Sequence, residues 1–380
     1  MGALRVGLDA HVLDGRYQGS RTWLVEILRR VPAMAPDITF VVYSADRRRV
    51  TELLADAPVE HRALQPGNAI TRNLVTWPRL IREHHLDLLV TQYFCAPRHP
   101  GRQVPVIHDV LFQTHPQFFP FKYRWRNRIL VGWAARHARS VITVSEYSRE
   151  QIALCYGRDP AAIAIVNNGV DAASFHPVPG DADPAAEARE TGALTETVTG
   201  GRPYALFVGR LEPRKNLRLL LDAFDRIDDP DVRLVVVGRD DFEEPQVLDR
   251  LAATDRAVHL VDVADAQLRE LYRDAAVLVF PSLGEGWGIP VLEALAAGTP
   301  VLASDVTAIP EAGGPACHYF SPTAPDAADR LAELVTAALS GLLPFDQQAA
   351  AAHVRSLSWD HSAEQFLRAI RATSGERIQA

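Results

Sequence analysis

Short apolar segments alternate with longer amphipathic ones along most of this 380-residue chain. Each short segment has the length and apolar run of a buried strand, and each longer one repeats apolar residues at helical spacing. A repeated strand–helix order is typical of βαβ units that build a parallel sheet. In the first half, the strand-like segments are 4–10, 37–44, 86–92, 104–110, 140–146 and 162–170.

The alternation stops at residues 176–203, which are rich in proline, glycine and acidic residues and have no strong apolar period. This composition predicts a linker or a long loop. A second series of strand-like segments follows at 204–211, 232–238, 257–263, 276–282 and 299–304. We therefore predict an α/β protein with two doubly wound domains. The predicted parts are a first domain at 1–176, a linker at 177–202, a second domain at 203–356 and a helical tail at 357–380.

The composition is that of a globular protein, with 47% hydrophobic and 23% charged residues. No run of about 18 apolar residues occurs, so we expect no membrane span. The N-terminus lacks the pattern of a signal peptide. Cys95, Cys155 and Cys317 are far apart, which predicts neither a zinc site nor a redox pair and favours a reducing, cytoplasmic setting.

The net charge of −7 conceals a basic first half, because residues 1–175 carry 22 basic and 15 acidic side chains. No nucleic-acid-binding module or dense basic run is present, so we expect no nucleic acid partner. A basic half suits an anionic acceptor or a membrane surface. Residues 118–133 interleave aromatic and basic residues, with Phe121, Trp125 and Ile129 spaced by four. This segment is either an interfacial membrane helix or a core helix with a solvated basic face.

The most informative segment is 280–304, FPSLGEGWGIPVLEALAAGTPVLAS, in which a strand, a glycine-rich loop, a helix and a second strand follow one another. Pro290 suits the first helical position, and the amides around it could bind an anionic oxygen such as phosphate. Gly286 and Gly288 would allow close approach of a ligand and a positive φ. The loop does not match the G-x-G-x-x-G/A dinucleotide fingerprint, which disfavours an NAD-dependent oxidoreductase.

Two glutamates flank this loop, Glu285 within it and Glu293 in the helix. Carboxylates accept hydrogen bonds from the paired hydroxyls of a sugar or a ribose. The two side chains could therefore hold opposite ends of one ligand. For Glu293 alone, a favourable interaction with the helix dipole is an equal alternative.

Two cations follow the first strand of the second domain, Arg210 and Lys215. They could neutralise a diphosphate and stabilise it as it departs. Lys215 is one of only two lysines in the chain, which favours a specific role for a compact charge. The alternative is a pair of solvated surface charges.

In the first domain, the strand at 104–110 ends in His108 and Asp109. Because ligands of such sheets bind at the carboxyl ends of strands, we predict that His108 lies in the active site. Asp109 would orient it, act as a weak base or cap the next turn. In the loop 14–21, which contains Gly19, Gly15 could supply flexibility, and Arg16 or Arg21 could contact an anionic ligand, although an ordinary turn would contain the same residue types.

Residues 280–304 resemble the signature of the retaining GT4 glycosyltransferases, and Glu285 and Glu293 match the E-x7-E motif of that family. The resemblance extends over essentially the whole chain. It implies the GT-B fold, in which two Rossmann-like domains face each other across a cleft, the first binding the acceptor and the second the nucleotide-sugar. It also implies a C-terminal helix that crosses back to the first domain. The apolar face expected for this helix consists of Ala363, Phe366, Leu367 and Ile370.

The resemblance also implies roles for the site residues. Glu293 would bind the ribose, and Glu285 the hydroxyls of the transferred sugar. Arg210 and Lys215 would bind the diphosphate, and His108 would contact the sugar near the reacting centre. The remaining donor-binding positions would be Gly286, Trp287, Gly288, Ile289, Val291 and Leu292. Trp287 stands where the family usually has phenylalanine, and the loop 14–21 lacks the usual Gly-Gly pair.

The implied activity is the transfer of a hexose-type sugar from a nucleotide-diphosphate sugar to a glycan, lipid-linked or small-molecule acceptor, with retention of configuration. We expect no metal and no cofactor, because the two cations would neutralise the leaving group. No carboxylate stands out as a nucleophile for double displacement. The alternatives are a non-catalytic nucleotide-sugar-binding protein and a GT-B nucleotide-sugar epimerase. The expected location is the cytoplasm, or the inner face of the membrane if residues 118–133 make a weak contact there.

Overall fold

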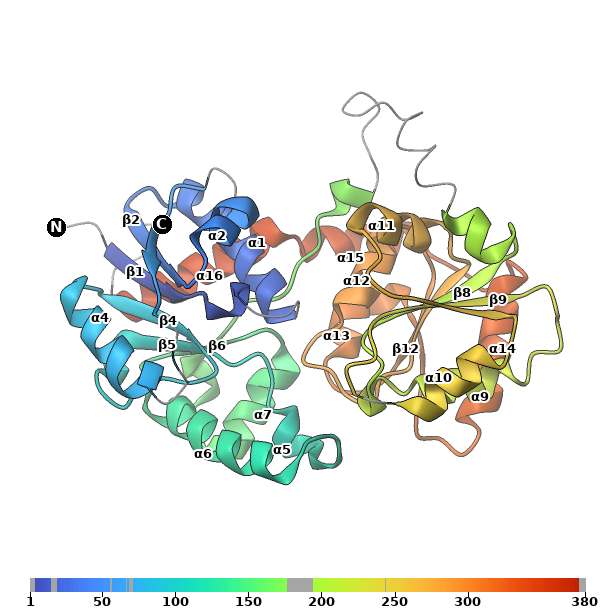
Figure 1. Cartoon of the computed structure of the whole chain (residues 1–380), viewed down its shortest axis with the longest axis horizontal. Helices are drawn as coiled ribbons and strands as arrows, with labels where there is room; N and C mark the ends of the chain where they lie inside the picture. The colour runs from blue at the N-terminus through green and yellow to red at the C-terminus, as the bar shows by residue number, and fades with distance from the viewer. Residues whose placement is uncertain are drawn as a thin grey trace. The chain divides into compact units, whose positions relative to one another are not determined.

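The computed structural model describes residues 4–14, 19–54, 57–65, 67, 71–175, 194–242 and 244–375 (Figure 1). Its internal contacts divide the chain into two compact units. The first unit comprises residues 1–169 and 359–380, and the second comprises residues 170–358. Each unit contains one parallel sheet, which confirms the predicted class of an α/β protein with two doubly wound domains.

The sheet of the first unit has seven strands in the order β3-β2-β1-β4-β5-β6-β7. Every neighbouring pair is parallel. All five residues of β4 are buried, as expected for a strand with covered faces on both sides. The strands are β1 (Leu4–Asp9), β2 (Ile38–Ser44), β3 (Glu60–Ala63), β4 (Leu88–Gln92), β5 (Gln103–Val106), β6 (Val141–Thr143) and β7 (Ile163–Ile165).

Helices cover both faces of this sheet, and one of them comes from the end of the chain (Figure 1). They are α1 (Gly19–Met34), α2 (Arg47–Leu54), α4 (Trp77–Glu83), α5 (Leu111–Thr114), α6 (Phe121–His137), α7 (Glu146–Tyr156) and α16 (Trp359–Ser374). Helix α16 packs on α1, where Phe366 contacts Trp23 with ring centroids 5.9 Å apart. Arg371 donates to Asp37 at 2.9 Å. The face predicted for the tail is buried at all four positions, so the C-terminal helix does return to the first unit.

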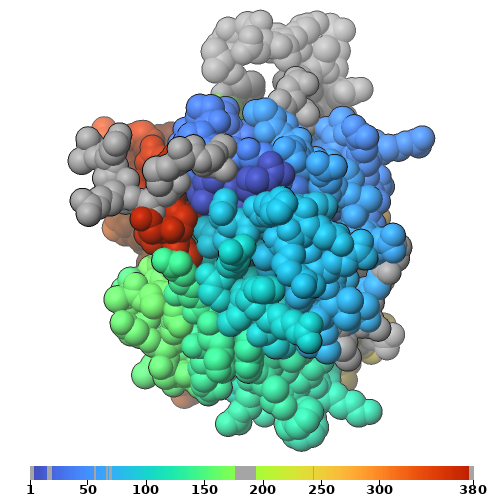
Figure 2. Space-filling view, turned by 90° about the vertical axis from the view of Figure 1, so that its left-hand side faces the viewer, coloured from blue at the N-terminus to red at the C-terminus, as the bar shows by residue number. Residues whose placement is uncertain are grey.

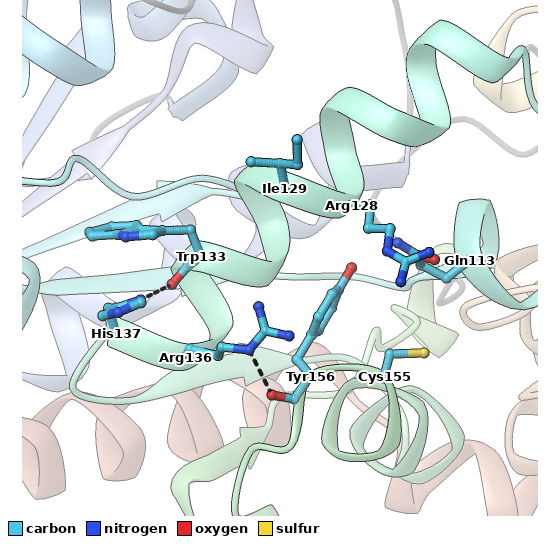
Figure 3. A pocket seen from close by; sticks show the side chains of 8 residues that line it. All are labelled: Gln113, Arg128, Ile129, Trp133, Arg136, His137, Cys155 and Tyr156. Carbon is cyan, nitrogen blue, oxygen red and sulfur yellow. Dashed lines mark hydrogen bonds between the residues drawn. The ribbon is translucent and has the colours of Figure 1, made fainter.

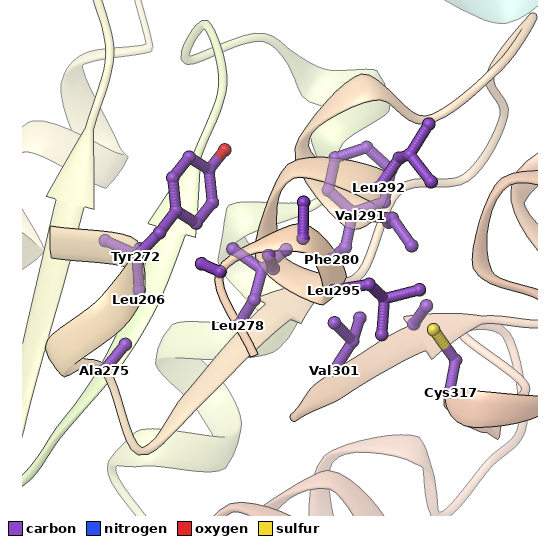
Figure 4. Packing of buried hydrophobic residues seen from close by; sticks show 14 of the residues in the cluster. Leu206, Tyr272, Ala275, Leu278, Phe280, Val291, Leu292, Leu295, Val301 and Cys317 are labelled. Carbon is purple, nitrogen blue, oxygen red and sulfur yellow. The ribbon is translucent and has the colours of Figure 1, made fainter. Parts of the chain in front are cut away.

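The sheet of the second unit has six parallel strands in the order β10-β9-β8-β11-β12-β13. Its strands are β8 (Tyr204–Val208), β9 (Arg233–Val237), β10 (Ala257–Leu260), β11 (Val277–Phe280), β12 (Val301–Ser304) and β13 (His318–Phe320). Its helices are α9 (Leu217–Phe224), α10 (Pro245–Ala252), α11 (Asp265–Asp274), α12 (Ile289–Ala296), α13 (Ile309–Gly313), α14 (Ala327–Leu339) and α15 (Gln347–Ser356). Figure 4 shows how β11 and α12 share one core, with Leu278 and Phe280 packed near Leu292 and Leu295. This core fixes the loop that joins β11 to α12.

Short helical turns connect several of these elements, and one of them, η7 (Pro213–Lys215), carries Arg214 and Lys215. The others are η1 (His11–Leu13), η2 (Arg72–Thr76), η3 (Pro100–Arg102), η4 (Pro116–Phe118), η5 (Pro160–Ala162), η6 (Ala172–Phe175) and η8 (Gly314–Ala316). Within the part of the chain that the structure describes, no helix has the length and apolarity needed to cross a bilayer.

The structure differs from the sequence-based prediction at two sheet edges and in the predicted linker. Strands β3 and β13 were not predicted, because each is short and β3 consists of the partly exposed residues EHRA. Edge strands need only one paired neighbour, so they lack the long apolar run of a central strand. In the linker, residues 194–199 are helical, and Leu194 and Val198 pack against the core of the second unit.

Candidate functional site

The site in the second unit lies at the carboxyl ends of β8 and β11. These strands are neighbours, but the chain continues from β8 towards one edge of the sheet and from β11 towards the other. Such a change in direction leaves a crevice between the two following loops, where ligands of doubly wound sheets bind. The two loops are residues 209–216 and 281–288.

Hydrogen bonds join these two loops. The Leu283 amide donates to the Arg214 carbonyl at 2.8 Å, and the Asn216 side chain donates to the Pro281 carbonyl at 3.2 Å. The Arg214 guanidinium also donates to the Gly284 carbonyl. Because these hydrogen bonds hold the two loops together, Arg214 and Lys215 of the first loop face the Glu285 carboxylate of the second.

Glu285 is buried between two of these cations. Its carboxylate lies 2.7 Å from the Arg214 guanidinium and 2.7 Å from the Lys215 ammonium. Burial alone would raise the pKa of Glu285, but the two positive charges outweigh it and lower the pKa to about 2. Glu285 is therefore an anion, held in one orientation, throughout the physiological pH range.

The two cations predicted to bind diphosphate have different environments. The Lys215 side chain is only 12% exposed, and its ammonium lies 5.0 Å from the centre of the Phe280 ring. Burial lowers the pKa of Lys215, and the nearby Glu285 carboxylate opposes this shift. The Arg210 side chain is 41% exposed, lies 3.6 Å from Glu212 and stacks over Phe242 at 5.2 Å. Arg210 is thus the cation of this cluster that reaches solvent.

Arg214 is a site residue that the sequence analysis missed. It pairs with Glu285 and with Glu212, which links both carboxylates of the cluster. Its exposed fraction is 12%, the same as that of Lys215. The signal was present in the sequence, because Arg214 is adjacent to Lys215, but an arginine in a basic run looks like a solvated charge.

The loop at 284–288 contains backbone amides that the fold leaves available. Helix α12 begins at Ile289, one residue before the predicted start, with Pro290 in its first turn. Among the hydrogen bonds between described residues, none starts from the amides of Gly286, Trp287 and Gly288. These three amides are the best candidates for an anionic oxygen.

Two backbone predictions for this loop need correction. The amides of Val291 and Leu292 donate to the Gly288 carbonyl at 3.0 and 3.3 Å, so they are occupied within the helix and are not free donors for a ligand. Gly288 has a φ of 169°, which is extended, and Gly286 is not among the described residues with positive φ. Gly288 serves close packing instead, because an added Cβ would lie 3.2 Å from the Cβ of Ala312.

Gly238, which was not predicted as a site residue, allows the ends of β8 and β9 to pack closely beside the loop 209–216. A Cβ on Gly238, at the end of β9, would lie 1.9 Å from the carbonyl oxygen of Gly209, at the end of β8. Only glycine permits this approach of the two strand ends. The neighbouring Leu211 amide then donates to the Arg239 carbonyl at 2.9 Å, which fixes the start of the loop that carries the cations.

Glu293, the second glutamate of the motif, is held by Tyr272. The Tyr272 hydroxyl, on α11, donates to the Glu293 carboxylate at 2.8 Å. Burial raises the pKa of Glu293, and this hydrogen bond opposes the shift. Tyr272 was also missed, because its aromatic ring in an apolar helix pattern predicts only a core residue.

In the first unit, His108 is enclosed by aromatic rings. It is 8% exposed, and its ring lies 5.7 Å from that of Trp23 and 5.8 Å from that of Tyr93. Its Nε2 lies 3.4 Å from the Gln92 side-chain oxygen. Burial lowers the pKa of His108 to about 4, so the ring is neutral at physiological pH. Its predicted contact with a sugar stays a prediction.

The remaining predicted residues of the first unit have local roles or are not described. Asp109 accepts a hydrogen bond from the Leu111 amide at 3.0 Å, which is the capping contact that the sequence left open. Gly19 is the first residue of α1. Gly15 and Arg16 lie outside the described residues. Within the described ranges, no group of three or more histidine, cysteine or acidic side chains is placed to hold a metal ion.

Comparison with family models identifies the chain. Residues 17–174 match the model described as Glycosyltransferase Family 4, and residues 202–340 match the model described as Glycosyl transferases group 1. The chain belongs to glycosyltransferase family 4. The two matches coincide with the two sheets, so each unit matches a glycosyltransferase model.

Relatives of this family 4 chain include the O-antigen chain mannosyltransferase B of Escherichia coli, 31% identical over 62% of this chain and 61% of the relative. The alpha-maltose-1-phosphate synthase of Mycobacterium tuberculosis is 34% identical over 60% of this chain and 62% of the relative. The D-inositol 3-phosphate glycosyltransferase of Mycobacteroides abscessus is 32% identical over 60% and 51%. The matches thus span about half to three fifths of the length of these relatives.

Solved structures share the fold along nearly the whole chain. A glycosyltransferase from Rickettsia africae has a TM-score of 0.73 at 16% identity and covers 98% of this chain and 99% of its own. The Anabaena protein Alr3699/HepE in complex with UDP-glucose has a TM-score of 0.71 at 18% identity, over 97% and 100%. These likenesses confirm the predicted fold, with two Rossmann-like domains of the GT-B type.

Proposed function

We propose that this family 4 chain transfers a hexose-type sugar from a nucleotide-diphosphate sugar to an acceptor. The observation that carries the proposal is Glu285, kept ionised by Arg214 and Lys215 beside the amides that precede α12. A fixed carboxylate suits sugar hydroxyls, and amides at a helix start suit phosphate. Family membership and relatives named as glycosyltransferases support the same activity.

The charges of the cluster favour a bound diphosphate. Arg210, Arg214 and Lys215 face two carboxylates, Glu212 and Glu285, so one positive charge is left over. A departing diphosphate gains negative charge in the transition state, and a preorganised positive site stabilises it. Arg210, as the exposed cation, would make the first contact. This neutralisation is our reason to propose that transfer needs no metal.

The remaining features of the reaction are also proposals. We infer retention of configuration from the resemblance at 280–304, and an acceptor that carries sugar or is linked to lipid. The cytoplasm is the proposed location, with residues 118–133 as the contact to the inner face of the membrane. His108 and Glu285 are the proposed residues at the transferred sugar. A neutral His108 can share a hydrogen bond with a hydroxyl without adding charge there.

The first experiment is a donor screen. Thermal shifts of the protein are measured with UDP-, GDP-, ADP- and TDP-sugars, and the stabilising donor is then incubated with candidate acceptors. We expect one donor class to raise the melting temperature and to yield a glycosylated product, unaffected by a metal chelator. The anomeric configuration of the product is read by NMR. Stabilisation without transfer or donor turnover would favour a binding protein, and conversion of the donor sugar alone an epimerase.

A further inference from the structure

The turn at residues 305–308 joins β12 to α13 and lies beside the loop that carries Glu285. Strands β11 and β12 are parallel neighbours, so the segments that follow them leave the sheet at the same edge. The Glu285 amide donates to the Thr307 hydroxyl at 2.9 Å, and the Ala308 amide donates to the Glu285 carbonyl at 3.4 Å. Both backbone groups of Glu285 are therefore bonded to this turn.

Thr307 has an unusual backbone conformation. Its φ is 57°, in the left-handed region, where the Cβ of an L-residue crowds the neighbouring backbone. A β-branched residue with such a φ is an outlier. Glycine adopts this conformation without strain, so what threonine adds at this position is its side chain. The other described non-glycine residues with positive φ are His85, Tyr93, His99, Asn216 and Asp262, and none of them is β-branched.

The Thr307 hydroxyl is oriented by a second hydrogen bond. It donates to the Val306 carbonyl at 2.7 Å, which leaves an oxygen lone pair for the Glu285 amide. Asn216, whose φ is 55°, has a similar role at the start of the same loop, where its side chain donates to the Pro281 carbonyl. The side chains of two left-handed residues thus hold the loop after β11 at its two ends.

The turn and the ion pairs hold different parts of Glu285. Arg214 and Lys215 each lie 2.7 Å from its carboxylate, whereas Thr307 holds the backbone from which the side chain projects. A functional side chain is precisely placed only when the groups around it fix its own position. Without the Thr307 hydroxyl, the Glu285 amide would lose its partner, and the backbone could shift to find another.

We propose that Thr307 is a positioning residue of the donor site. Its hydroxyl fixes the Glu285 backbone, and the fixed backbone aims the Glu285 carboxylate at the transferred sugar. Strained residues persist at functional sites where surrounding contacts enforce them, as the hydrogen bonds of this turn do. The inference rests on the proposed function, because it assumes that Glu285 contacts that sugar. It predicts an effect at the sugar end of the donor, and not at the diphosphate end.

The first test compares, by calorimetry, binding of the sugar nucleotide selected by the donor screen with binding of the matching UDP, GDP, ADP or TDP. Thr307→Val keeps the branched shape and removes the hydroxyl. We expect it to bind the sugar nucleotide about tenfold more weakly, and the diphosphate within about twofold of the wild type. Thr307→Ser keeps the hydroxyl and should bind both ligands normally. Wild-type affinity in Thr307→Val, or an equal loss for both ligands, would overturn the proposal.

Thr307→Gly separates the hydroxyl from the strain, because it removes both. It should bind the sugar nucleotide as weakly as Thr307→Val does. It should also melt at a higher temperature than Thr307→Val, since only glycine adopts this φ without strain. A general loss of structure would instead link weaker binding to a lower melting temperature. Wild-type affinity in Thr307→Gly would show that the hydroxyl is dispensable, which contradicts the proposal.

Two control variants each remove a hydroxyl hydrogen bond that does not involve Glu285. Thr336→Val, on α14, removes a bond to the Ala332 carbonyl. Tyr156→Phe, on α7 of the first unit, removes a bond to the Gln113 side chain. Tyr156 lines a cavity of about 410 Å³ (Figure 3), and α6, which lines the same cavity, lies at the surface in the lower part of Figure 2. Both controls should bind the sugar nucleotide like the wild type, and a tenfold loss in either would contradict a specific role of Thr307.

The second test needs no donor. Hydrogen exchange of the Glu285 amide is followed by NMR in the ligand-free protein. Because the Thr307 hydroxyl accepts from this amide, exchange should be about tenfold faster in Thr307→Val and unchanged in Thr307→Ser. Equal exchange rates in the wild type and Thr307→Val would overturn the proposal, whatever the binding data show.

The two tests distinguish a failure of the proposed function from a failure of this inference. If no sugar nucleotide binds to the wild type, the proposed function fails, while faster exchange in Thr307→Val still shows that Thr307 holds Glu285. If Thr307→Val binds the donor as well as the wild type does, the proposed function stands and the positioning role fails.

Discussion

The ends of β11 and β5 each place a predicted catalytic side chain after a buried parallel strand, but they surround it with opposite chemistry. After β11, Glu285 lies between Arg214 and Lys215 and stays ionised although it is buried. After β5, His108 lies among aromatic rings and stays neutral. Position at a strand end therefore does not fix the role of a residue. The partners that share its burial decide whether it carries a charge.

The largest expected effect follows from removing the charge after β11. Glu285→Gln leaves Arg214 and Lys215 buried without their shared carboxylate. We expect the free energy of unfolding to fall by about 3 kcal/mol, as for a broken buried ion pair. Transfer activity should fall about 100-fold or more, because the proposed sugar contact is also lost. Glu333→Gln, in an exposed ion pair with Arg330, is the control and should change stability by less than about 1 kcal/mol.

The same substitution changes the pH dependence of stability. The pKa of Glu285 is about 2 in the folded chain and 4.5 in an ordinary setting, so its contribution is complete above pH 4.5 and is lost as the pH falls towards 2. Urea unfolding of the wild type should show this loss, and Glu285→Gln should reduce it. Parallel curves for the two proteins would contradict the ionised state of Glu285.

His108 should change the pH dependence of stability in a higher pH range than Glu285. Its pKa is about 4 in the folded chain, below the ordinary 6.5, so the unfolded chain binds a proton that the folded chain excludes. Stability should be complete above pH 6.5 and fall by about 3 kcal/mol towards pH 4. His108→Phe, which keeps a ring beside Trp23 and Tyr93, should flatten this part of the curve. The same slope in the variant would place the titrating group elsewhere.

Tyr272→Phe removes one hydroxyl from the proposed nucleotide-sugar site of the second unit. The hydrogen bond to Glu293 is lost, while the ring contact with Phe175 can remain. We expect about a tenfold weaker donor affinity in calorimetry, because an oriented carboxylate becomes free to turn. Tyr204→Phe is the control, because it also removes a buried tyrosine hydroxyl, but that hydroxyl donates to the Leu271 carbonyl and not to Glu293. Equal weakening in both variants would exclude a specific role of Tyr272.

Gly288→Ala should have the smallest effect. Its backbone is extended, so alanine causes no conformational strain, and the added Cβ lies 3.2 Å from Ala312. We expect a loss of about 1 kcal/mol in the free energy of unfolding. A loss comparable to that of Glu285→Gln would show that the loop needs glycine for a reason other than packing.

The central strands could be predicted because burial on both faces imposes long apolar runs. Strands β3 and β13 could not, since an edge strand with the sequence EHRA has no such run. The E-x7-E spacing pointed to the loop of Glu285, and the apolar spacing of the tail predicted the buried face of α16. Patterns within short stretches of sequence were thus sufficient to predict the fold.

The partners of the site residues could not be predicted from spacing. Arg214 and Tyr272 reach Glu285 and Glu293 from other loops and helices, and only the fold brings them together. The approach of Gly238 to Gly209 is of the same kind, because it depends on two strand ends that are far apart in the sequence. Contacts between loops on one sheet edge therefore need the structure, even where each loop is recognisable by itself.

The most direct test of the account is donor binding by Lys215→Met, measured by calorimetry with the nucleotide-sugar that stabilises the wild type. Methionine keeps most of the volume beside Phe280 and removes the charge that faces Glu285. Arg226→Met, in an exposed ion pair with Asp329, is the control. The account predicts that Lys215→Met loses about 100-fold in donor affinity while the control binds normally. Wild-type affinity in Lys215→Met would contradict the claim that this charge cluster holds the donor.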